Sequence, residues 1–470
     1  MDTLPYDQVV KIHSRDIEKL KLRKTVWDEV GSRPVMISAV IPTFNKNDPK
    51  YNKALMRVLM DCCNLVDKGI LDEIVIAEGS RMEDGSPDFD FIEFILAVCF
   101  KYCKTFKSEV AFINQLPEGR KKALEGRFDF CVRILNQIDP ELHKIFLKHK
   151  LLTEDEIEFL KQGKGGNLWF SIPVTYGDIL CFVDSDIVSF NENYIKGLCY
   201  PLLSSWGEEN PKLFSKATYT RRHKMKLGKY KIGGRLSRLA AIPLFKVLSE
   251  RNILEGLDGV TYPFSGECAF TRETLNNIQF SNGYDIETSV LCQLWKKYSV
   301  ENMELVDLGF FQHLPGTEDH TDDMLDEITK ALFYWIRKYG LKKNLGNIEK
   351  LLDDYEKTAK STLDWYEVRA TRHPGKIIYG KEQRNEDLRR IKRYKKIILK
   401  GYKKSSGWEP KLLKPWSEIK EKTDSTVGYS YMNFKNTLQK RVNKFTSDTI
   451  LTKIHVHIDR TRSIIDEHIK

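Results

Sequence analysis

The chain of 470 residues lacks the segments that would place it in or across a membrane. It contains no run of about 18 apolar residues, the length that a membrane-spanning helix needs. Its first residues also lack the apolar core that follows a basic start in secretory signals. We therefore expect a cytoplasmic protein without a transmembrane segment.

Cysteine pairs and common nucleotide-binding signatures are missing as well. The nine cysteines include no two that are separated by two residues, the spacing typical of zinc sites and redox motifs. Several lie inside apolar runs, so we interpret them as reduced core cysteines. The sequence contains neither a Walker A motif nor the pattern G-x-G-x-x-G, which argues against a P-loop NTPase and a nicotinamide-dependent enzyme.

Acidic residues are scarce towards the C-terminus. Residues 371–470 hold 25 basic and 11 acidic side chains, whereas residues 1–370 hold 51 and 55, so the net charge of +10 arises in the last hundred residues. The charge therefore says little about the chemistry of the body. It leaves open a second class of protein, one that binds nucleic acid or an anionic membrane surface, although a solvated or self-associating helix is favoured.

What the sequence does contain is an alternation of short apolar runs and helical patterns. The predicted strands are 35–41, 72–80, 108–113 and 177–184, and the predicted helical segments are 51–68, 92–107, 121–137 and 138–162. This alternation favours an α/β fold with a mostly parallel sheet, in which ligands bind at the carboxyl ends of the strands. From residue 321 onward the pattern is helical and includes a basic segment at 384–400.

The pattern that points most directly to chemistry is Asp184-Ser185-Asp186, which follows the apolar run 179–183. Two carboxylates at a strand end can hold one divalent cation bound to a diphosphate, and hard carboxylate oxygens suit Mg²⁺ or Mn²⁺. The alternative is a polar exit from the strand that caps the next helix.

Two glycine-containing basic segments are candidate phosphate sites. Lys164 lies between glycines before a predicted helix, whose N-terminal N–H groups attract anions; the alternative is a flexible surface loop. Residues 211–249 contain eleven basic and no acidic side chains, and Gly234, Arg235 and Ser237 lie before a helical run. This segment predicts a cradle for a small phosphate or carboxylate substrate, with a solvated basic face as the alternative.

Three further side chains lie in candidate loops. His313 follows a predicted strand at 304–311 and can complete a cation site with Asp186, although a lone histidine is more often structural. Glu267 and Glu287 are flanked by glycines. Either can hydrogen-bond sugar hydroxyls or an acceptor, and either can equally cap a helix.

The order and spacing of these motifs resemble those of the glucosyl-3-phosphoglycerate synthases, which are retaining glycosyltransferases of the GT-A fold. The resemblance covers about residues 35–335. The segments that carry it are Pro42-Thr43-Phe44-Asn45, Gly79-Ser80, Gly163-Lys164-Gly165, Asp184-Ser185-Asp186, Gly233-Gly234-Arg235, Gly266-Glu267, Gly283-Tyr284 with Glu287, and Val306-Asp307-Leu308-Gly309 with His313.

The resemblance implies a GT-A fold with a Rossmann-like nucleotide-binding half, an acceptor-binding half and a helical C-terminal extension. We place an N-terminal helical extension at 1–34, the nucleotide-sugar half at 35–200, the acceptor half at 201–335 and the basic extension at 336–470. The implied reaction moves glucose from a nucleoside-diphosphate glucose, usually UDP-glucose, to 3-phosphoglycerate with retention, giving glucosyl-3-phosphoglycerate. The implied cofactor is Mg²⁺ or Mn²⁺.

The resemblance also assigns roles to single residues. The implied nucleotide-sugar contacts are Pro42, Thr43, Phe44, Ser80, Lys164 and Asp184; the cation ligands are Asp186 and His313; the acceptor contacts are Gly234, Arg235 and Ser237; and the catalytic positions are Glu287 and Asp186.

Two positions depart from the family pattern. Lys46 stands where an acidic residue usually follows the asparagine, and Asp48 or Glu78 can take the place of that acid. Phe311 stands where an arginine usually precedes the histidine by two residues. These departures keep open the transfer of mannose or another sugar to a different phosphorylated or carboxylated acceptor. The helices after residue 321 also suggest a homodimer contact.

Overall fold

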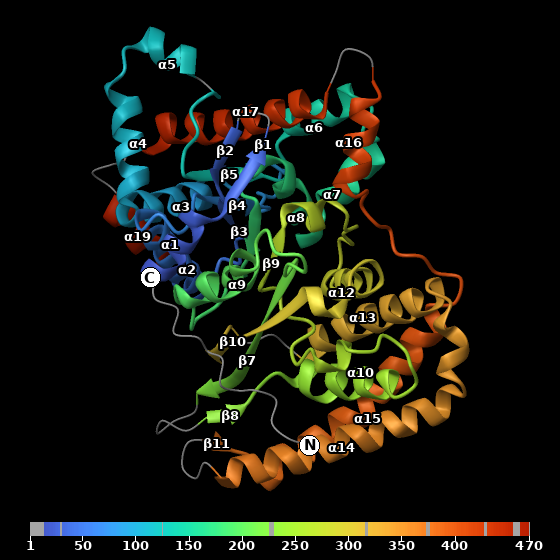
Figure 1. The fold of residues 1–470 in the computed structure, drawn as a ribbon. Helices are drawn as coiled ribbons and strands as arrows, with labels where there is room; N and C mark the ends of the chain where they lie inside the picture. Colours follow the sequence, from blue (N-terminus) through green and yellow to red (C-terminus); the bar gives the residue numbers. More distant parts are fainter. Residues whose placement is uncertain are drawn as a thin grey trace. The chain divides into compact units, whose positions relative to one another are not determined.

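The computed structural model describes residues 14–28, 31–124, 126–224, 230–314, 318–372, 377–426, 430–454 and 461–469. The chain divides into two compact units, each built from separate stretches of sequence (Figure 1). Unit 1 consists of Met1–Lys216, Gly266–Asn282 and Leu413–Lys470, and unit 2 consists of Ala217–Ser265 and Gly283–Leu412. The consecutive functional segments proposed from the sequence stay a prediction.

Unit 1 contains a mostly parallel sheet with the strand order β9-β6-β3-β4-β5. Its strands are β3 (Ile37–Thr43), β4 (Glu73–Glu78), β5 (Val132–Asn136), β6 (Ile179–Phe182) and β9 (Cys268–Thr271). The first four strands are parallel to one another, and β9 runs antiparallel to β6. The parallel strands are continuous apolar runs because their residues are buried on both faces of the sheet.

Helices surround this sheet, and one antiparallel strand pair precedes it. The pair is β1 (Thr25–Asp28) and β2 (Gly31–Pro34). The helices are α1 (Ser14–Arg23), α2 (Pro49–Asp67), α3 (Phe89–Tyr102), α4 (Lys104–Gln115), α5 (Glu118–Leu124), α6 (Pro140–Lys148), α7 (Glu154–Leu160), α8 (Lys164–Val174), α9 (Asn193–Ser204), α11 (Arg272–Asn276), α16 (Trp416–Asp424), α17 (Tyr431–Thr449) and α19 (Thr461–Ile469). α17 packs against β5, α6 and α8, so the C-terminal residues are part of the core of unit 1 (Figure 1).

Unit 2 combines a small group of strands with long helices. The strands are β7 (Phe214–Lys224, in unit 2 from Ala217), β8 (Tyr230–Ile232), β10 (Met303–Phe311) and β11 (Ile377–Ile378). The helices are α10 (Ile242–Ser249), α12 (Ile286–Lys297), α13 (Glu318–Lys338), α14 (Ile348–Arg372) and α15 (Lys381–Lys404). β7 pairs with β8 and β10, and α15 packs against α13 and α14.

The basic segment at 384–400 is the middle of α15, as predicted, and many of its charges are paired within unit 2. The ion pairs of the segment include Arg384 with Asp364 and Glu367, Arg393 with Asp322, Lys395 with Asp353 and Glu356, and Lys400 with Asp326, which also pairs with Lys404 at the end of α15. Apolar side chains of α15, including Ile391 and Ile398, are fully buried. α15 is therefore a structural helix of unit 2 rather than a free basic arm.

The predicted α/β class, the mostly parallel sheet and the helical C-terminal region are confirmed. Two element assignments are wrong. Residues 108–113 are part of helix α4 rather than a strand, because Phe106, Val110 and Ile113 form one buried helical face. The predicted helix at 121–137 ends with α5, and its last residues form the central-sheet strand β5. Short apolar runs such as 132–136 fit either element until their packing partners are known.

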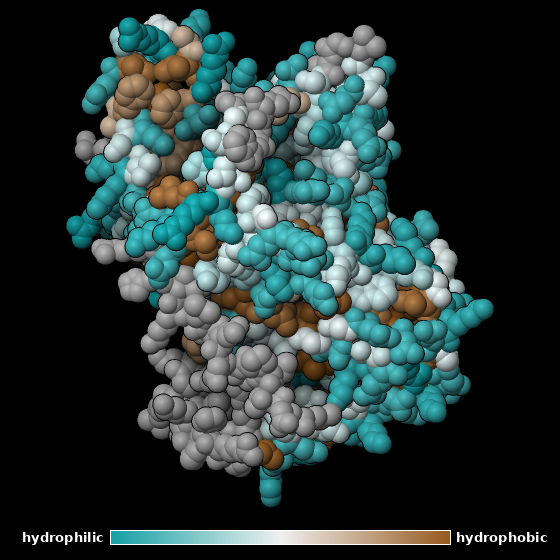
Figure 2. Space-filling model, viewed as in Figure 1, coloured by the Kyte–Doolittle hydropathy of each residue, from teal (hydrophilic) through white to brown (hydrophobic). Residues whose placement is uncertain are grey.

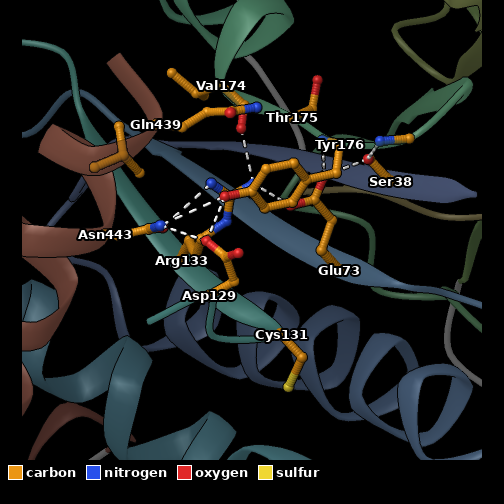
Figure 3. Close-up of polar contacts among 12 residues, drawn as sticks. Ser38, Glu73, Asp129, Cys131, Arg133, Val174, Thr175, Tyr176, Gln439 and Asn443 are labelled. Carbon is orange, nitrogen blue, oxygen red and sulfur yellow. Dashed lines mark hydrogen bonds and ion pairs between the residues drawn. The ribbon is translucent and has the colours of Figure 1, made fainter. Parts of the chain in front are cut away.

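A buried polar network lies beside the start of β4 and β5 and joins these strands to α17 (Figure 3). The Arg133 guanidinium forms an ion pair with Glu73, donates to the carbonyl of Val174 at 2.8 Å and lies over the Tyr176 ring at 4.2 Å. It also donates to Asn443 of α17 at 3.4 Å. The network therefore uses a charge in the core to fix the position of α17 on the sheet.

The surface of unit 1 carries an apolar patch around α4 and α5 (Figure 2). Figure 2 shows hydrophobic side chains gathered over α4 and α5, where Phe112 is 51% exposed and stacks on Phe128 with ring centroids 6.0 Å apart. No helix among the described residues is both long enough and apolar enough to span a bilayer.

Candidate functional site

The order of the strands places a ligand site at the carboxyl ends of the central strands β3 and β6 of unit 1. β3 lies between β4 and β6, so the chain proceeds to one side of β3 through β4 and β5 and then returns to its other side with β6. In open α/β sheets ligands bind at the carboxyl ends of the strands where such a reversal occurs. Pro42 and Thr43 are the last residues of β3, which continues two residues beyond the predicted strand, and Phe44 follows them. The segment after β6 contains Asp184-Ser185-Asp186, as the sequence predicted.

Lys164 and Asp184 form one half of this site. The Lys164 ammonium lies 2.5 Å from Asp184 Oδ1, and each side chain is about one third exposed. Gly266, which enters β9, packs directly against the pair: a Cβ there would lie 2.6 Å from Asp184 Oδ2 and 2.7 Å from Lys164 Nζ. A larger residue at 266 would therefore displace both charged groups. Glu267, the next residue, is buried.

The glycines around Lys164 are required by close packing rather than by loop flexibility. A Cβ on Gly165 would lie 1.9 Å from the carbonyl oxygen of Ser281, and one on Gly166 would lie 2.0 Å from that of Leu160. The helix α8 begins at Lys164 itself, slightly earlier than predicted, with Gly163 as its N-cap. Lys164 is thus held on a rigid helix start, where N–H groups favour anions.

Asp186 and Lys46 form the other half of the site. Lys46 Nζ lies 3.2 Å from Asp186 Oδ2 and 4.9 Å from the centroid of the Tyr51 ring. The buried Tyr51 connects the two loops, because its hydroxyl lies 2.9 Å from Ser185 Oγ and accepts a hydrogen bond from the Phe44 N–H. Burial raises the pKa of Tyr51, so this hydroxyl stays protonated at neutral pH.

The residues expected to contact the nucleotide base surround the end of β3. Thr43 and Ser80 are buried, whereas the Phe44 side chain is 52% exposed. Ser80 Oγ accepts a hydrogen bond from the Asn45 N–H at 2.6 Å, and Asn45 Nδ2 donates to Asp88 at 2.8 Å. The structure therefore holds the segment after β3, which carries Phe44, next to Ser80 of the segment after β4, and Phe44 offers an accessible face on which a planar base can stack.

Glu78 and Asp48 have structural roles. Glu78 is fully buried at the end of β4 and accepts the Ser80 N–H at 2.7 Å. Burial raises the pKa of Glu78 to about 8, although hydrogen bonds from Ser80 act in the opposite direction. Asp48 caps α2 by accepting the Lys50 N–H at 2.8 Å. Each acid therefore has a partner within its own segment.

The raised pKa of Glu78 predicts a pH dependence of stability. The unfolded chain loses this proton above about pH 4.5, whereas the folded protein keeps it until about pH 8. The contribution of Glu78 to folding therefore becomes less favourable as the pH rises through this interval. We expect the Glu78→Gln variant to gain stability relative to the wild type from pH 5 to pH 8, by a few kcal/mol in total at roughly 1.4 kcal/mol per pKa unit.

Urea unfolding of both proteins at pH 5, 6, 7, 8 and 9 measures this difference. Gln is the suitable replacement because its amide keeps an acceptor for the Ser80 N–H and a donor like the protonated acid. A constant difference in unfolding free energy across this range would contradict the assignment.

In unit 2, the predicted acceptor residues share one turn before α10. Gly234 has φ of +71°, and a Cβ there would lie 2.7 Å from the Tyr262 hydroxyl, so the position requires glycine. Arg235 is partly exposed, and Ser237 is buried at the start of a π-helical segment that leads into α10. The arrangement combines a tight glycine turn, a guanidinium and a hydroxyl, which suits a phosphate or carboxylate group.

Side chains of α15 contact the residues on both sides of this turn and support it. Arg238 is buried and its Nη1 lies 2.7 Å from Asp387 of α15, which also accepts a hydrogen bond from the Tyr379 hydroxyl at 3.0 Å. Gln383 of α15 donates to the carbonyl oxygen of Ile232 at 2.9 Å. One basic residue of the segment 211–249 is therefore structural, and a helix of the basic C-terminal region holds the turn in place.

His313 and Phe311 lie at the end of β10. His313 Nδ1 contacts the carbonyl oxygen of Leu314. Histidines that bind metal ions commonly direct their other ring nitrogen to a backbone carbonyl, so this contact is compatible with the ligand role that the resemblance implies. Phe311 is buried and stacks on Tyr219, with ring centroids 3.9 Å apart and planes 5° apart. Phe311 therefore belongs to an aromatic stack between β7 and β10.

Glu287 lies in the first turn of α12 and is partly exposed. The turn before it is held by Glu327 of α13, whose carboxylate accepts the Tyr284 N–H at 3.0 Å. Ser289 in turn donates to Asp285 at 3.1 Å. The geometry fixes the backbone around Glu287, and its predicted role beside the reacting groups stays a prediction.

The structure thus gathers the predicted nucleotide residues at one strand edge of unit 1 and the predicted acceptor residues in one turn of unit 2. The pairing of Asp186 with His313 stays a prediction from the resemblance. The sequence did not indicate the contact of Lys46 with Asp186. It also gave no sign that Tyr51 connects the two loops, because this residue is simply the first position of the helical pattern at 51–68. Among the residues that the structure describes, no cluster of three or more histidine, cysteine, aspartate or glutamate side chains has the arrangement of a metal site.

Comparison with known sequences supports the resemblance, although no family model matches the chain. The glucosyl-3-phosphoglycerate synthase of Petrotoga mobilis is 33% identical over 202 residues, which are 42% of this chain and 57% of the relative. The synthase of Mycolicibacterium smegmatis is 34% identical over 152 residues, or 32% of this chain and 47% of the relative. The chain therefore spans about half the length of these curated relatives. The similarity predicted from the motif order is confirmed.

Similar solved structures carry the same name. The glucosyl-3-phosphoglycerate synthase of Mycobacterium tuberculosis, in complex with Mn²⁺, UDP and glucosyl-3-phosphoglycerate, is 21% identical with a TM-score of 0.46. The match covers 69% of this chain and 84% of that chain. The same synthase in complex with Mn²⁺, UDP-glucose and phosphoglyceric acid is 22% identical, with the same coverage and a TM-score of 0.44.

Proposed function

We propose that the chain is a metal-dependent retaining glycosyltransferase that moves glucose from a nucleoside-diphosphate glucose, with UDP-glucose as the expected donor, to 3-phosphoglycerate. The observation that carries the proposal is the strand-end site of unit 1, where Asp184 and Asp186 follow β6 and Lys164 opens α8 beside them. Carboxylates and a lysine at a helix start are the groups that a metal-bound diphosphate requires. The curated relatives compared above are named glucosyl-3-phosphoglycerate synthases.

The residues of this site fit a divalent cation. Mg²⁺ in nucleotide sites is usually held by one or two carboxylates together with phosphate oxygens and water, so one aspartate with one further side chain is a sufficient protein contribution. Asp186 is the proposed ligand, with His313 as the second ligand that the resemblance implies. When bound, the ion supplies positive charge that stabilises a leaving diphosphate.

Side chains of this chain have separate proposed tasks in the reaction. Lys164 contacts the donor diphosphate, and Phe44 with Ser80 holds the base. In unit 2, Gly234, Arg235 and Ser237 hold the phosphate of the acceptor. The hydroxyl of the acceptor attacks the anomeric carbon from the face that the diphosphate leaves, and a leaving oxygen takes the hydroxyl proton. Glu287 is then a positioning group rather than a required base.

The departures at Lys46 and Phe311 favour a second candidate within the same class. Phe311 forms a buried aromatic stack with Tyr219 where an arginine is expected, so one cationic side chain of the family is absent at this position. Transfer of mannose or another sugar, or transfer to another phosphorylated or carboxylated acceptor, is therefore the alternative.

A donor and acceptor panel tests the proposal. The purified chain with Mg²⁺ is incubated with UDP-glucose, ADP-glucose, GDP-glucose or GDP-mannose, each with and without 3-phosphoglycerate, and release of the nucleoside diphosphate is measured. We expect release from UDP-glucose that depends on the acceptor. Acceptor-dependent release from GDP-mannose alone would establish the alternative, and release from none of the donors with any phosphorylated acid would contradict the proposed function.

The remaining proposals concern partners and location. The nine cysteines are free thiols, eight of them buried, which fits a reducing cytoplasm. The proposed homodimer contact lies on the helical region after residue 321, which begins with α13. Contact of the basic C-terminal region with an anionic surface is the weaker proposal, because the basic side chains of α15 already pair with acids of α13 and α14.

A further inference from the structure

Lys46 is the unexplained feature of the donor site. The sequence presents it as the loss of an acidic residue, but the structure places its ammonium 3.2 Å from Asp186 Oδ2. It also lies 4.9 Å from the centroid of the Tyr51 ring, within the range of a cation–π contact. The Lys46 ammonium therefore contacts the same carboxylate, that of Asp186, which is proposed to bind the metal ion.

The segment that carries Lys46 is well defined by its own hydrogen bonds. The Asn45 N–H donates to Ser80 Oγ at 2.6 Å, and Asn45 Oδ1 accepts the Asn47 N–H at 2.9 Å. Asn47 has φ of +49°, a left-handed conformation that asparagine tolerates. Lys46 thus projects from a fixed turn at the end of β3 towards the loop after β6.

The contact with Asp186 is one that a stronger cation can replace. The Lys46 side chain is 49% exposed and that of Asp186 is 27% exposed. Ion pairs at such exposed positions are weak, because water screens the attraction and long side chains lose entropy. A divalent ion carries twice the charge and forms direct bonds to carboxylate oxygens, so it can displace the ammonium from Asp186.

Both carboxylates of the Asp184-Ser185-Asp186 turn are paired with a lysine. Asp184 contacts Lys164, and Asp186 contacts Lys46. The two aspartates therefore offer an incoming cation less net negative charge than an unpaired carboxylate pair would. The ammonium groups of Lys46 and Lys164, which lie near the carboxyl ends of the same strands, instead favour the binding of an anion such as a diphosphate.

We propose that Lys46 is a resident cation of the donor site, which competes with the divalent ion for Asp186 and contributes positive charge to the donor diphosphate. This inference rests on the proposed function, because it assumes that a diphosphate binds at this strand edge. It assigns to Lys46 two measurable effects of opposite sign. Lys46 weakens metal binding to the donor-free protein, and it strengthens diphosphate binding when no metal is present.

The first measurement is the affinity of the donor-free full chain for Mn²⁺, followed by electron paramagnetic resonance of the unbound ion. We expect the Lys46→Met variant to bind Mn²⁺ about tenfold more tightly than the wild type, because one competing positive charge is removed. Lys46→Arg keeps the charge and is expected to bind as weakly as the wild type. Lys53→Met, which removes an exposed lysine from α2, is the matched control and is expected to leave the affinity unchanged.

The second measurement is the binding of UDP in the presence of a chelator, by isothermal titration calorimetry. We expect Lys46→Met to weaken it about fivefold to tenfold, and Lys46→Arg and Lys53→Met to leave it near the wild-type value. Thermal unfolding of each variant verifies that the fold is intact.

Each outcome bears on the proposal. Mn²⁺ affinity that is unchanged or weaker in Lys46→Met, including no Mn²⁺ binding by either protein, overturns the competition. Unchanged UDP affinity overturns the contact with the diphosphate. If UDP binds to no variant with or without Mn²⁺, the proposed donor site itself fails, whereas the Mn²⁺ titration still reports on the Lys46–Asp186 pair.

Discussion

The Arg133→Met substitution is expected to lower the free energy of unfolding by about 3–5 kcal/mol, the cost typical of removing one partner of a buried ion pair. The Arg133 and Glu73 side chains are almost completely buried and contact each other directly (Figure 3). Burial alone would raise the pKa of Glu73, but the Arg133 charge and hydrogen bonds from Ser38 and Tyr176 hold it below its ordinary value. Without Arg133, Glu73 remains a buried charge without its counter-ion.

Urea unfolding of the single and double variants measures this effect. The double variant Arg133→Met with Glu73→Gln removes both charges, so we expect it to recover a large part of the lost stability. Lys144→Met is the matched control, because it breaks an exposed ion pair of 2.6 Å with Glu141 and is expected to cost less than about 1 kcal/mol. A double variant no more stable than Arg133→Met alone would show that the charge of Glu73 is not the cause.

The Asp186→Asn substitution is expected to lower the turnover number with saturating donor on the order of 10²- to 10³-fold, the usual loss when one electrostatic contact of the transition state is removed. The amide keeps the shape of the side chain but no longer carries the charge that is proposed to hold the divalent ion. Because the Asp186 side chain is partly exposed, the fold is expected to tolerate the change.

The measurement is the initial rate of acceptor-dependent nucleotide release across a range of Mg²⁺ concentrations. Asp155→Asn on α7 removes an equally charged, exposed carboxylate of unit 1 and is expected to leave the rate unchanged. An Asp186→Asn rate within tenfold of the wild-type rate at ordinary Mg²⁺ would remove Asp186 from the proposed metal site.

Much of the fold could be predicted because its signals are local. The runs at 35–41, 72–80 and 177–184 became β3, β4 and β6, since continuous apolar residues flanked by turns fit a strand buried on both faces. The strand at 132–136 could not be separated from a helix in the same way. Its assignment depends on the pairing with β4 and on the packing of α17, both of which involve distant residues.

The same distinction between local signals and contacts of distant residues applies to the candidate site. The sequence by itself determined which residue types follow the strands, so Asp184, Asp186 and Lys164 could be selected from their positions next to apolar runs and glycines. Only the tertiary structure decided which of them meet. The parallel pairing of β3 with β6 brings Lys46 to Asp186, and the antiparallel pairing of β9 brings Gly266 to Lys164 and Asp184. Local patterns report the environment of a segment, whereas contacts between segments depend on the order in which strands join a sheet.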